Sequence, residues 1–145
     1  MKRLLLVLVF VPLALVGWVQ AVSAAEAGRP FSTTLTGAAE VPGPGDPDGS
    51  GTATLTVNPG LGQVCYTLMV EGVEPIRAAH IHVGTADVAG PVVVPLLPPV
   101  DGSSSGCAEV SRELALAIIQ NPENYYVNVH NAFFPAGALR GQLSR

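Results

Sequence analysis

Glycine and proline interrupt this chain at short intervals, and this limits what it can fold into. Of its 145 residues, 16 are Gly and 13 are Pro. Because both residues break helices and strands, a chain this rich in them favours many short strands joined by turns over a helical bundle. The length fits a single domain.

The segments between these breaks alternate polar and apolar residues, as half-buried β-strands do. The clearest is 52–57, where Ala53, Leu55 and Val57 alternate with threonines. By the same criterion, strands are predicted at 31–36, 52–57, 63–70, 77–84, 90–97, 124–131 and 138–143, and the Ser/Gly-rich run 102–106 is predicted to be a loop.

One short helix is predicted after Ser111, whose hydroxyl can cap it. Its apolar stripe is formed by Leu114, Leu116, Ile118 and Ile119, and Asn121-Pro122 ends it. With about seven short strands and this one helix, the predicted fold class is all-β: an antiparallel β-sandwich or a partly closed barrel.

Residues 1–25 have the pattern of an export signal. Lys2 and Arg3 precede the apolar run 4–19, and small residues follow at 21–25. The run is short for a permanent membrane span, which needs about 20 apolar residues. A cleaved signal peptide is therefore predicted, with a retained anchor as the alternative. The mature protein is expected to be secreted or extracytoplasmic, without membrane contact once the signal is cleaved.

Cys65 and Cys107 both lie beyond the predicted signal. In an oxidising compartment an even pair of cysteines favours a disulfide bond, and two buried thiols are the alternative. The bridge would close a long loop, which the chain-entropy model values at roughly 4 kcal/mol.

Charge and motifs exclude several classes of function. The net charge is −4 and the chain shows no basic patch, which argues against a nucleic-acid partner. The sequence holds no Gly-x-Ser-x-Gly, no Gly-rich phosphate loop and no His-Glu-x-x-His motif. No catalytic constellation is visible, so the protein is predicted not to be an enzyme.

Strand alternation predicts a polar face that contains every histidine of the chain. His80 and His82 lie opposite the apolar Ile81, and His130 lies opposite Val129 in a later strand. A hairpin folded about Phe134 would place the last strand beside the His130 strand. If the His80 strand also lies beside this hairpin, the three histidines share one face with Tyr126, Asn128, Arg140 and Gln142.

Two roles for this face are compatible with the sequence. His80 and His82 would lie about 6.6 Å apart along one strand, and with His130 they could hold a copper or zinc ion. Alternatively, the imidazoles hydrogen-bond Asn128, Arg140 and loop carbonyls and fasten the strands together. The structural role is the predicted one, so no cofactor is expected, and copper or zinc is the alternative.

Several segments together resemble one known family. They are LTGAAEVP at 35–42, AAHIHVG at 78–84, GPVVV at 90–94, YYVNVH at 125–130 and PAGALRGQL at 135–143. Over residues 31–143 the chain resembles a CHRD domain, which is repeated in chordin and stands alone in many exported bacterial proteins. The resemblance implies a non-enzymatic extracellular binding or structural module, whose partner would be an unknown extracellular protein or cell-surface ligand.

Two functions of similar proteins, growth-factor binding and a two-metal site, are not expected for this chain. In chordin the domains accompany cysteine-rich modules that bind growth factors, and two cysteines cannot form such a module. The His-x-His segment is also similar to a strand of copper–zinc superoxide dismutase, but three histidines are too few for its two-metal site. A mononuclear metal protein with superoxide dismutase-like redox activity is kept as the alternative function.

Overall fold

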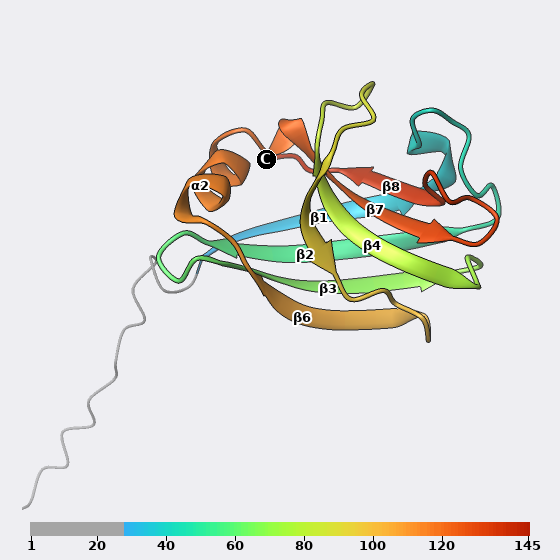
Figure 1. The fold of residues 1–145 in the computed structure, drawn as a ribbon, viewed down its shortest axis with the longest axis horizontal. Helices are drawn as coiled ribbons and strands as arrows, with labels where there is room; N and C mark the ends of the chain where they lie inside the picture. Colours follow the sequence, from blue (N-terminus) through green and yellow to red (C-terminus); the bar gives the residue numbers. More distant parts are fainter. Residues whose placement is uncertain (1–27) are drawn as a thin grey trace, which may run out of the picture.

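The computed structural model describes residues 28–145, so the predicted export signal at 1–25 lies outside the described residues. The described chain forms eight strands in one sheet, which confirms the all-β fold class (Figure 1). The strands are β1 (Arg29–Thr36), β2 (Ser50–Asn58), β3 (Gln63–Glu71), β4 (Ile76–Val83), β5 (Val92–Leu96), β6 (Ser103–Glu109), β7 (Tyr125–Asn131) and β8 (Leu139–Gln142). The helical elements are η1 (Gly37–Ala39), α2 (Arg112–Gln120) and η2 (Pro122–Asn124).

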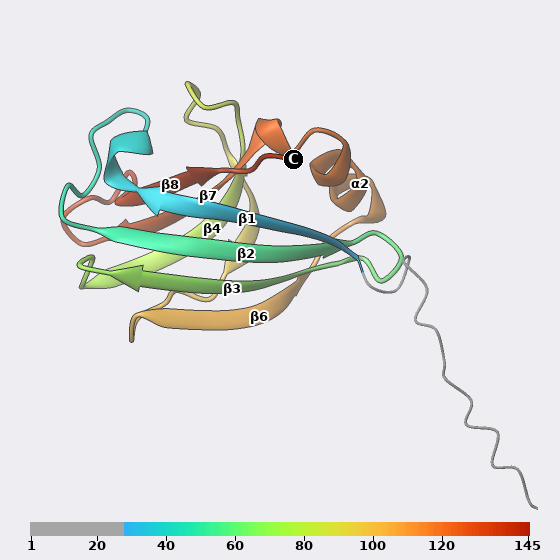
Figure 2. The ribbon, with the colours of Figure 1, turned by 180° about the vertical axis from the view of Figure 1, so that it is seen from behind.

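The sheet curls into a nearly closed barrel. Its strand order is β5-β4-β7-β8-β1-β2-β3-β6, and every paired neighbour is antiparallel. Figure 2 shows β8, β1, β2, β3 and β6 following one another across one side. Side chains connect the end of β5 to the far end of the sheet: the Leu97 amide, just after β5, donates to the Tyr66 hydroxyl of β3 at 2.8 Å, and the Ser104 hydroxyl of β6 donates to the Leu97 carbonyl at 2.7 Å.

The prediction of a loop at 102–106 was wrong, because β6 begins at Ser103. Serine and glycine have low strand propensity, so this segment carries almost no local strand signal. Its strand conformation comes from the partner: β6 pairs with β3 in continuous register, with Thr67 opposite Ser105 and Cys65 opposite Cys107. In this segment, pairing with β3 outweighs the low strand propensity of the residues.

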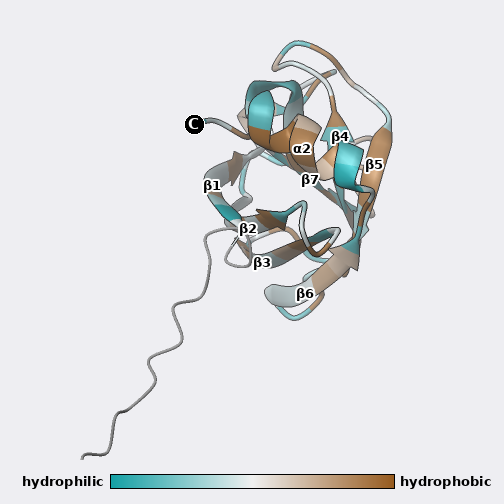
Figure 3. Cartoon of the chain, turned by 90° about the vertical axis from the view of Figure 1, so that its left-hand side faces the viewer, coloured by the Kyte–Doolittle hydropathy of each residue, from teal (hydrophilic) through white to brown (hydrophobic). Residues whose placement is uncertain are grey.

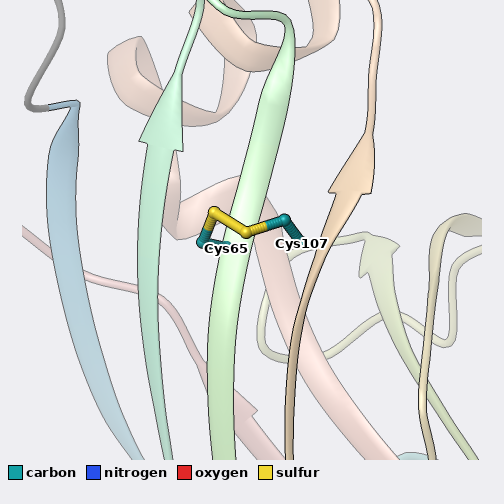
Figure 4. The surroundings of a disulfide bond; sticks show 2 residues. All are labelled: Cys65 and Cys107. Carbon is teal, nitrogen blue, oxygen red and sulfur yellow. A yellow bond between two sulfur atoms is a disulfide. The ribbon is translucent and has the colours of Figure 1, made fainter.

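The cysteines form the predicted disulfide bond between these two strands. The sulfur atoms of Cys65 and Cys107 are 2.06 Å apart, and Figure 4 shows the bridge crossing from β3 to β6. Since β6 is an edge strand with β3 as its sheet neighbour, the bridge fastens the edge covalently to the sheet.

The interior is built from the alternating apolar positions, as the pattern predicts. Ala53, Leu55 and Val57 of β2 are all buried. From the opposite side, β4 contributes Ile81, and β7 contributes Val127 and Val129, which are also buried. Figure 3 looks from the side of α2 and shows β4 and β7 across the interior from β2, β3 and β6.

The predicted helix is present as α2. The Ser111 hydroxyl accepts a hydrogen bond from the Leu114 amide at 3.1 Å, which confirms the cap. Ile118 is buried as predicted, but Ala115 is the other fully covered residue, and Leu116 is only half-buried. Within residues 28–145, no helix has the length and apolarity that a membrane span requires.

Candidate metal centre

The strand adjacency on which the polar face depends is present. β4 pairs with β7, which places His80 opposite Asn128 and His82 opposite Tyr126. β7 pairs with β8 in the predicted hairpin register, with Asn128 opposite Arg140 and Tyr126 opposite Gln142. Residues directly opposite each other point to the same face of a sheet. The predicted polar face therefore exists on the outside of β4, β7 and β8.

The three histidines converge on this face. Ligand nitrogens of His80, His82 and His130 all lie within 4.8 Å of one another. The closest pair is Nδ1 of His80 and Nε2 of His130, at 3.2 Å. Among residues 28–145, no carboxylate or thiolate joins this group of nitrogens. The donor set is purely imidazole.

Backbone carbonyls orient two of these rings. Nδ1 of His82 lies 2.8 Å from the Gly90 carbonyl, and Nδ1 of His130 lies 3.1 Å from the Pro135 carbonyl. Because a carbonyl oxygen can only accept, each Nδ1 carries the ring proton and each Nε2 keeps a free lone pair. Metal-binding histidines are oriented by the same kind of hydrogen bond.

His80 contributes its Nδ1 to the cluster, whereas His82 and His130 keep their lone pair on Nε2. Without an ion, the Nδ1–H of His80 can donate to the lone pair on Nε2 of His130. Moving that proton to Nε2 of His80 leaves a lone pair on Nδ1, next to the lone pair of His130. One tautomer change therefore converts a hydrogen-bonded pair into a three-nitrogen donor set.

His82 contains the most informative atom of the cluster. Its Nε2 is buried and has no hydrogen-bond partner. An unsatisfied buried polar atom costs about 1–3 kcal/mol, so such atoms are uncommon in stable folds unless a ligand satisfies them. A bound metal ion would use this lone pair directly.

The electrostatics keep the cluster neutral. Burial lowers the pKa of each of the three histidines below the ordinary 6.5. Repulsion from His130 and His82 lowers the pKa of His80 further. For His82, the Gly90 hydrogen bond opposes the effect of burial, and the positive charge of Arg140 adds to it. Neutral imidazole is the form that binds metals, so near neutral pH the cluster is ready for one.

The predicted structural contacts of the histidines are formed only in part. The bonds to loop carbonyls are present, at Gly90 and Pro135. The predicted bonds to Asn128 and Arg140 are absent, since the side-chain amide of Asn128 donates to the Glu40 carboxylate and to the Leu139 carbonyl. Glu40, in the connection 37–49, occupies the side chain of Asn128, and carbonyls of the connection 84–91 occupy that of Arg140. The sequence pattern does not predict where these two connections lie.

Arg140 is held by the connection at 84–91. Its guanidinium donates to the carbonyls of Thr85 at 2.7 Å and Val88 at 3.1 Å, and to the side-chain oxygen of Gln142 at 3.1 Å. Its carbon Cζ lies 3.5 Å from the centroid of the Tyr126 ring. Arg140 is only 1% exposed, so a full positive charge is buried beside the histidine cluster.

Glu40 belongs to this region and was missed by the sequence analysis. It follows η1, is buried, and accepts from the side-chain amide of Asn128. A Cβ atom on Gly137 would collide with its carboxylate, so the glycine makes room for it. Burial raises the pKa of Glu40 to about 7, although the Asn128 hydrogen bond and the Arg140 charge oppose this. No local motif marks this residue, because its surroundings come from β7 and β8.

The fold and this site define a small disulfide-bonded β-barrel with a three-histidine cluster on its outer surface. The CHRD domain model matches residues 31–143, which is most of the chain. The protein therefore belongs to the CHRD family. Comparisons with curated proteins and with solved structures gave no match.

Proposed function

We propose that this protein is an exported, non-enzymatic CHRD module that binds one transition-metal ion through His80, His82 and His130. The observation that carries the proposal is the buried, unpartnered Nε2 of His82, on a ring whose ligand nitrogen lies within 4.8 Å of a ligand nitrogen of each of the other two histidines. The strand-fastening role predicted from the sequence leaves this nitrogen unsatisfied. A metal ion satisfies it.

The donor set favours copper or zinc. Imidazole suits both metals, whereas calcium and magnesium prefer oxygen ligands. Two nitrogens bound to one tetrahedral zinc ion lie about 3.4 Å apart. The nitrogens of His80 and His130 are already 3.2 Å apart, and the ligand nitrogens of all three histidines lie within 4.8 Å of one another, so a small inward movement would suffice. Of the two ions, copper binds more tightly to a given set of nitrogen ligands.

Export is supported by the disulfide bond and by the sequence pattern at 1–25. A disulfide between Cys65 and Cys107 is expected to persist in an oxidising compartment. In such a compartment the module would meet an extracellular protein or a cell-surface ligand as its partner. N-terminal sequencing of protein recovered outside the cytoplasm should find Ala25 or Glu26 first. A chain that retains residues 4–19 in the membrane fraction would contradict export with cleavage.

Calorimetric titration of chelator-treated, tag-free protein with Cu²⁺ and Zn²⁺ tests the metal site. We expect one ion per chain with micromolar or tighter affinity, weakened by at least about tenfold in His82→Gln because one ligand is lost. Binding should also fade as the pH falls below 6.5 and through the lowered pKa values of the three histidines, because a protonated imidazole cannot bind a metal ion.

The matched control is Glu71→Gln, which removes an exposed carboxylate from β3 and leaves the histidines intact. It should bind like the wild type. If the wild type binds neither metal ion, or if His82→Gln binds as tightly as the wild type, the metal site is contradicted and the strand-fastening role is supported.

A further inference from the structure

We infer that the ion held by the three histidines keeps an open coordination position for a small anion, and that the buried Arg140 draws the anion there. This inference rests on the proposed metal site and adds to it the chemical class of an exogenous ligand.

The ligand count leaves at least one position open. Zinc takes four ligands, and copper takes four or more. In the described part of the chain, the cluster offers three imidazole nitrogens and no carboxylate or thiolate. His82 is buried, but His80 and His130 are only half-buried, so the open position can be reached from solvent. A ligand from outside the chain can therefore complete the coordination.

The charge of Arg140 is not neutralised by a direct partner. Its three acceptors are two backbone carbonyls and the amide oxygen of Gln142, all of them neutral. Two carboxylates, those of Glu40 and Asp87, interact with Arg140 only through space: the first accepts from Asn128 and the second from Thr85. A buried cation without an ion-pair partner creates a positive potential that low dielectric surroundings strengthen.

An aromatic ring connects this charge to the metal ligands. Tyr126 stacks on His82 with ring centroids 4.8 Å apart and an angle of 12° between the planes. Arg140 lies over the same tyrosine ring, at 3.5 Å from its centroid. Because β7 lies between β4 and β8, Tyr126 separates the histidine from the arginine. The guanidinium of Arg140 is thus separated from the proposed ligand His82 by a single aromatic ring.

The position of the charge selects the kind of ligand. A neutral donor, such as free imidazole, would gain little from the Arg140 field. An anion gains the Coulomb attraction of the guanidinium in addition to its bond to the metal. A small, monodentate anion fits best, since three histidines already surround the ion and leave limited space.

The test uses the full chain loaded with Cu²⁺ at pH 8, with azide as the anionic probe and imidazole as the neutral one. Azide binding is followed by the azide-to-copper charge-transfer absorption, and imidazole binding by the shift of the copper d–d band. We expect the wild type to bind azide. Arg140→Gln should weaken azide binding by about tenfold through the lost Coulomb term and leave imidazole binding unchanged.

Glu40→Gln provides an independent test with the opposite sign. The glutamine keeps the size of the side chain and an oxygen that accepts from Asn128, but it removes a negative charge. Azide should therefore bind several-fold more tightly at pH 8 in Glu40→Gln than in the wild type, while Glu71→Gln should not differ. This variant decides the question even if the buried Arg140 cannot be replaced without unfolding.

The outcomes separate the two proposals. If the wild type does not bind Cu²⁺, the metal site itself fails, and the anion position fails with it. If Cu²⁺ binds but azide leaves the spectrum unchanged, the site has no open position and this inference alone is overturned. The same holds if azide and imidazole respond equally to both substitutions, because the charge then plays no part.

Discussion

The two sides of the barrel share one interior pattern but have contrasting outer faces. On β1, β2, β3 and β6, which we call the threonine wall, hydroxyl groups such as those of Thr34, Thr54 and Thr67 stand exposed. On β4, β7 and β8, the histidine wall, the corresponding positions hold buried polar groups: His82, Asn128 and Arg140. The alternation of inward and outward residues alone predicts that the outward side chains of both walls are equally exposed.

Loops cause the difference. The connections at 37–49 and 84–91 fold over the histidine wall, where Glu40 reaches Asn128 and the carbonyls of Thr85 and Val88 reach Arg140. In Figure 1 both connections lie on the side of the barrel that carries β8. The threonine wall depends instead on its strand ladder and on the disulfide. A polar outer face thus becomes a chemical site only where other segments cover it and remove water.

The largest expected effect concerns the threonine wall. Replacing both Cys65 and Cys107 by Ala should lower the free energy of unfolding by about 4 kcal/mol, because the bridge closes a loop across 42 positions of sequence. Urea denaturation followed by circular dichroism measures the loss. Wild-type protein treated with a reductant should show a similar loss. A change below about 1 kcal/mol in both experiments would mean that this wall does not depend on the covalent link.

The next effect tests the covered face of the histidine wall. Arg140→Met should cost about 3 kcal/mol, because it leaves the carbonyls of Thr85 and Val88 without their donor. Arg77→Met, on the same wall but at an exposed position, should change stability by less than about 0.5 kcal/mol. Thr54→Val on the open face of the threonine wall should also stay within about 0.5 kcal/mol. Equal costs in urea denaturation for the three variants would remove the contrast between the walls.

The smallest effect is a pH dependence centred on Glu40. Its pKa is raised from 4.5 to about 7 in the folded protein, so the folded state binds this proton more tightly than the unfolded state. The stability that this proton contributes is fully present below pH 4.5 and is lost as the pH rises through about 7. The wild type should therefore lose stability relative to Glu40→Gln between pH 5 and pH 8.

The size of that relative loss is on the order of 1–2 kcal/mol. Comparing the two proteins is necessary because the histidines act in the opposite sense. Their lowered pKa makes the folded state resist protonation, so the stability they contribute is present above 6.5 and is lost as the pH falls from 6.5 through their lowered pKa values. Urea denaturation of both proteins at each pH isolates Glu40, and parallel stability curves would show that its carboxyl is not desolvated.

The features that the sequence did not predict are those that depend on segments far away in the chain. Ser103–Glu109 was assigned partly to a loop, since its serines and glycine say nothing about the partner strand that pairs with them. Glu40 was not singled out, because an isolated Glu in a Gly/Ala/Pro-containing segment is usually exposed. The residue and the strand both acquire their roles from segments far away in the chain.

The histidine cluster was predictable because it depends on short-range regularity. Strand alternation has a period of two, so His80 and His82 had to share a face, and the hairpin at 125–142 had to place Asn128 opposite Arg140. The one long-range assumption was that β4 lies beside β7, which the structure confirms. That a metal occupies the cluster stays a prediction.

By itself, the sequence determined the all-β class, the inner and outer positions of most strands, the helix cap and the cysteine pair. These features follow from periodicity and from residue chemistry within a few positions. Only the tertiary structure decided which outer face is covered, which carbonyls orient His82 and His130, and how Tyr126 comes to lie between His82 and Arg140. Burial, hydrogen-bond partners and shifted pKa values arise where distant segments exclude water together, and no local pattern in the chain records that exclusion.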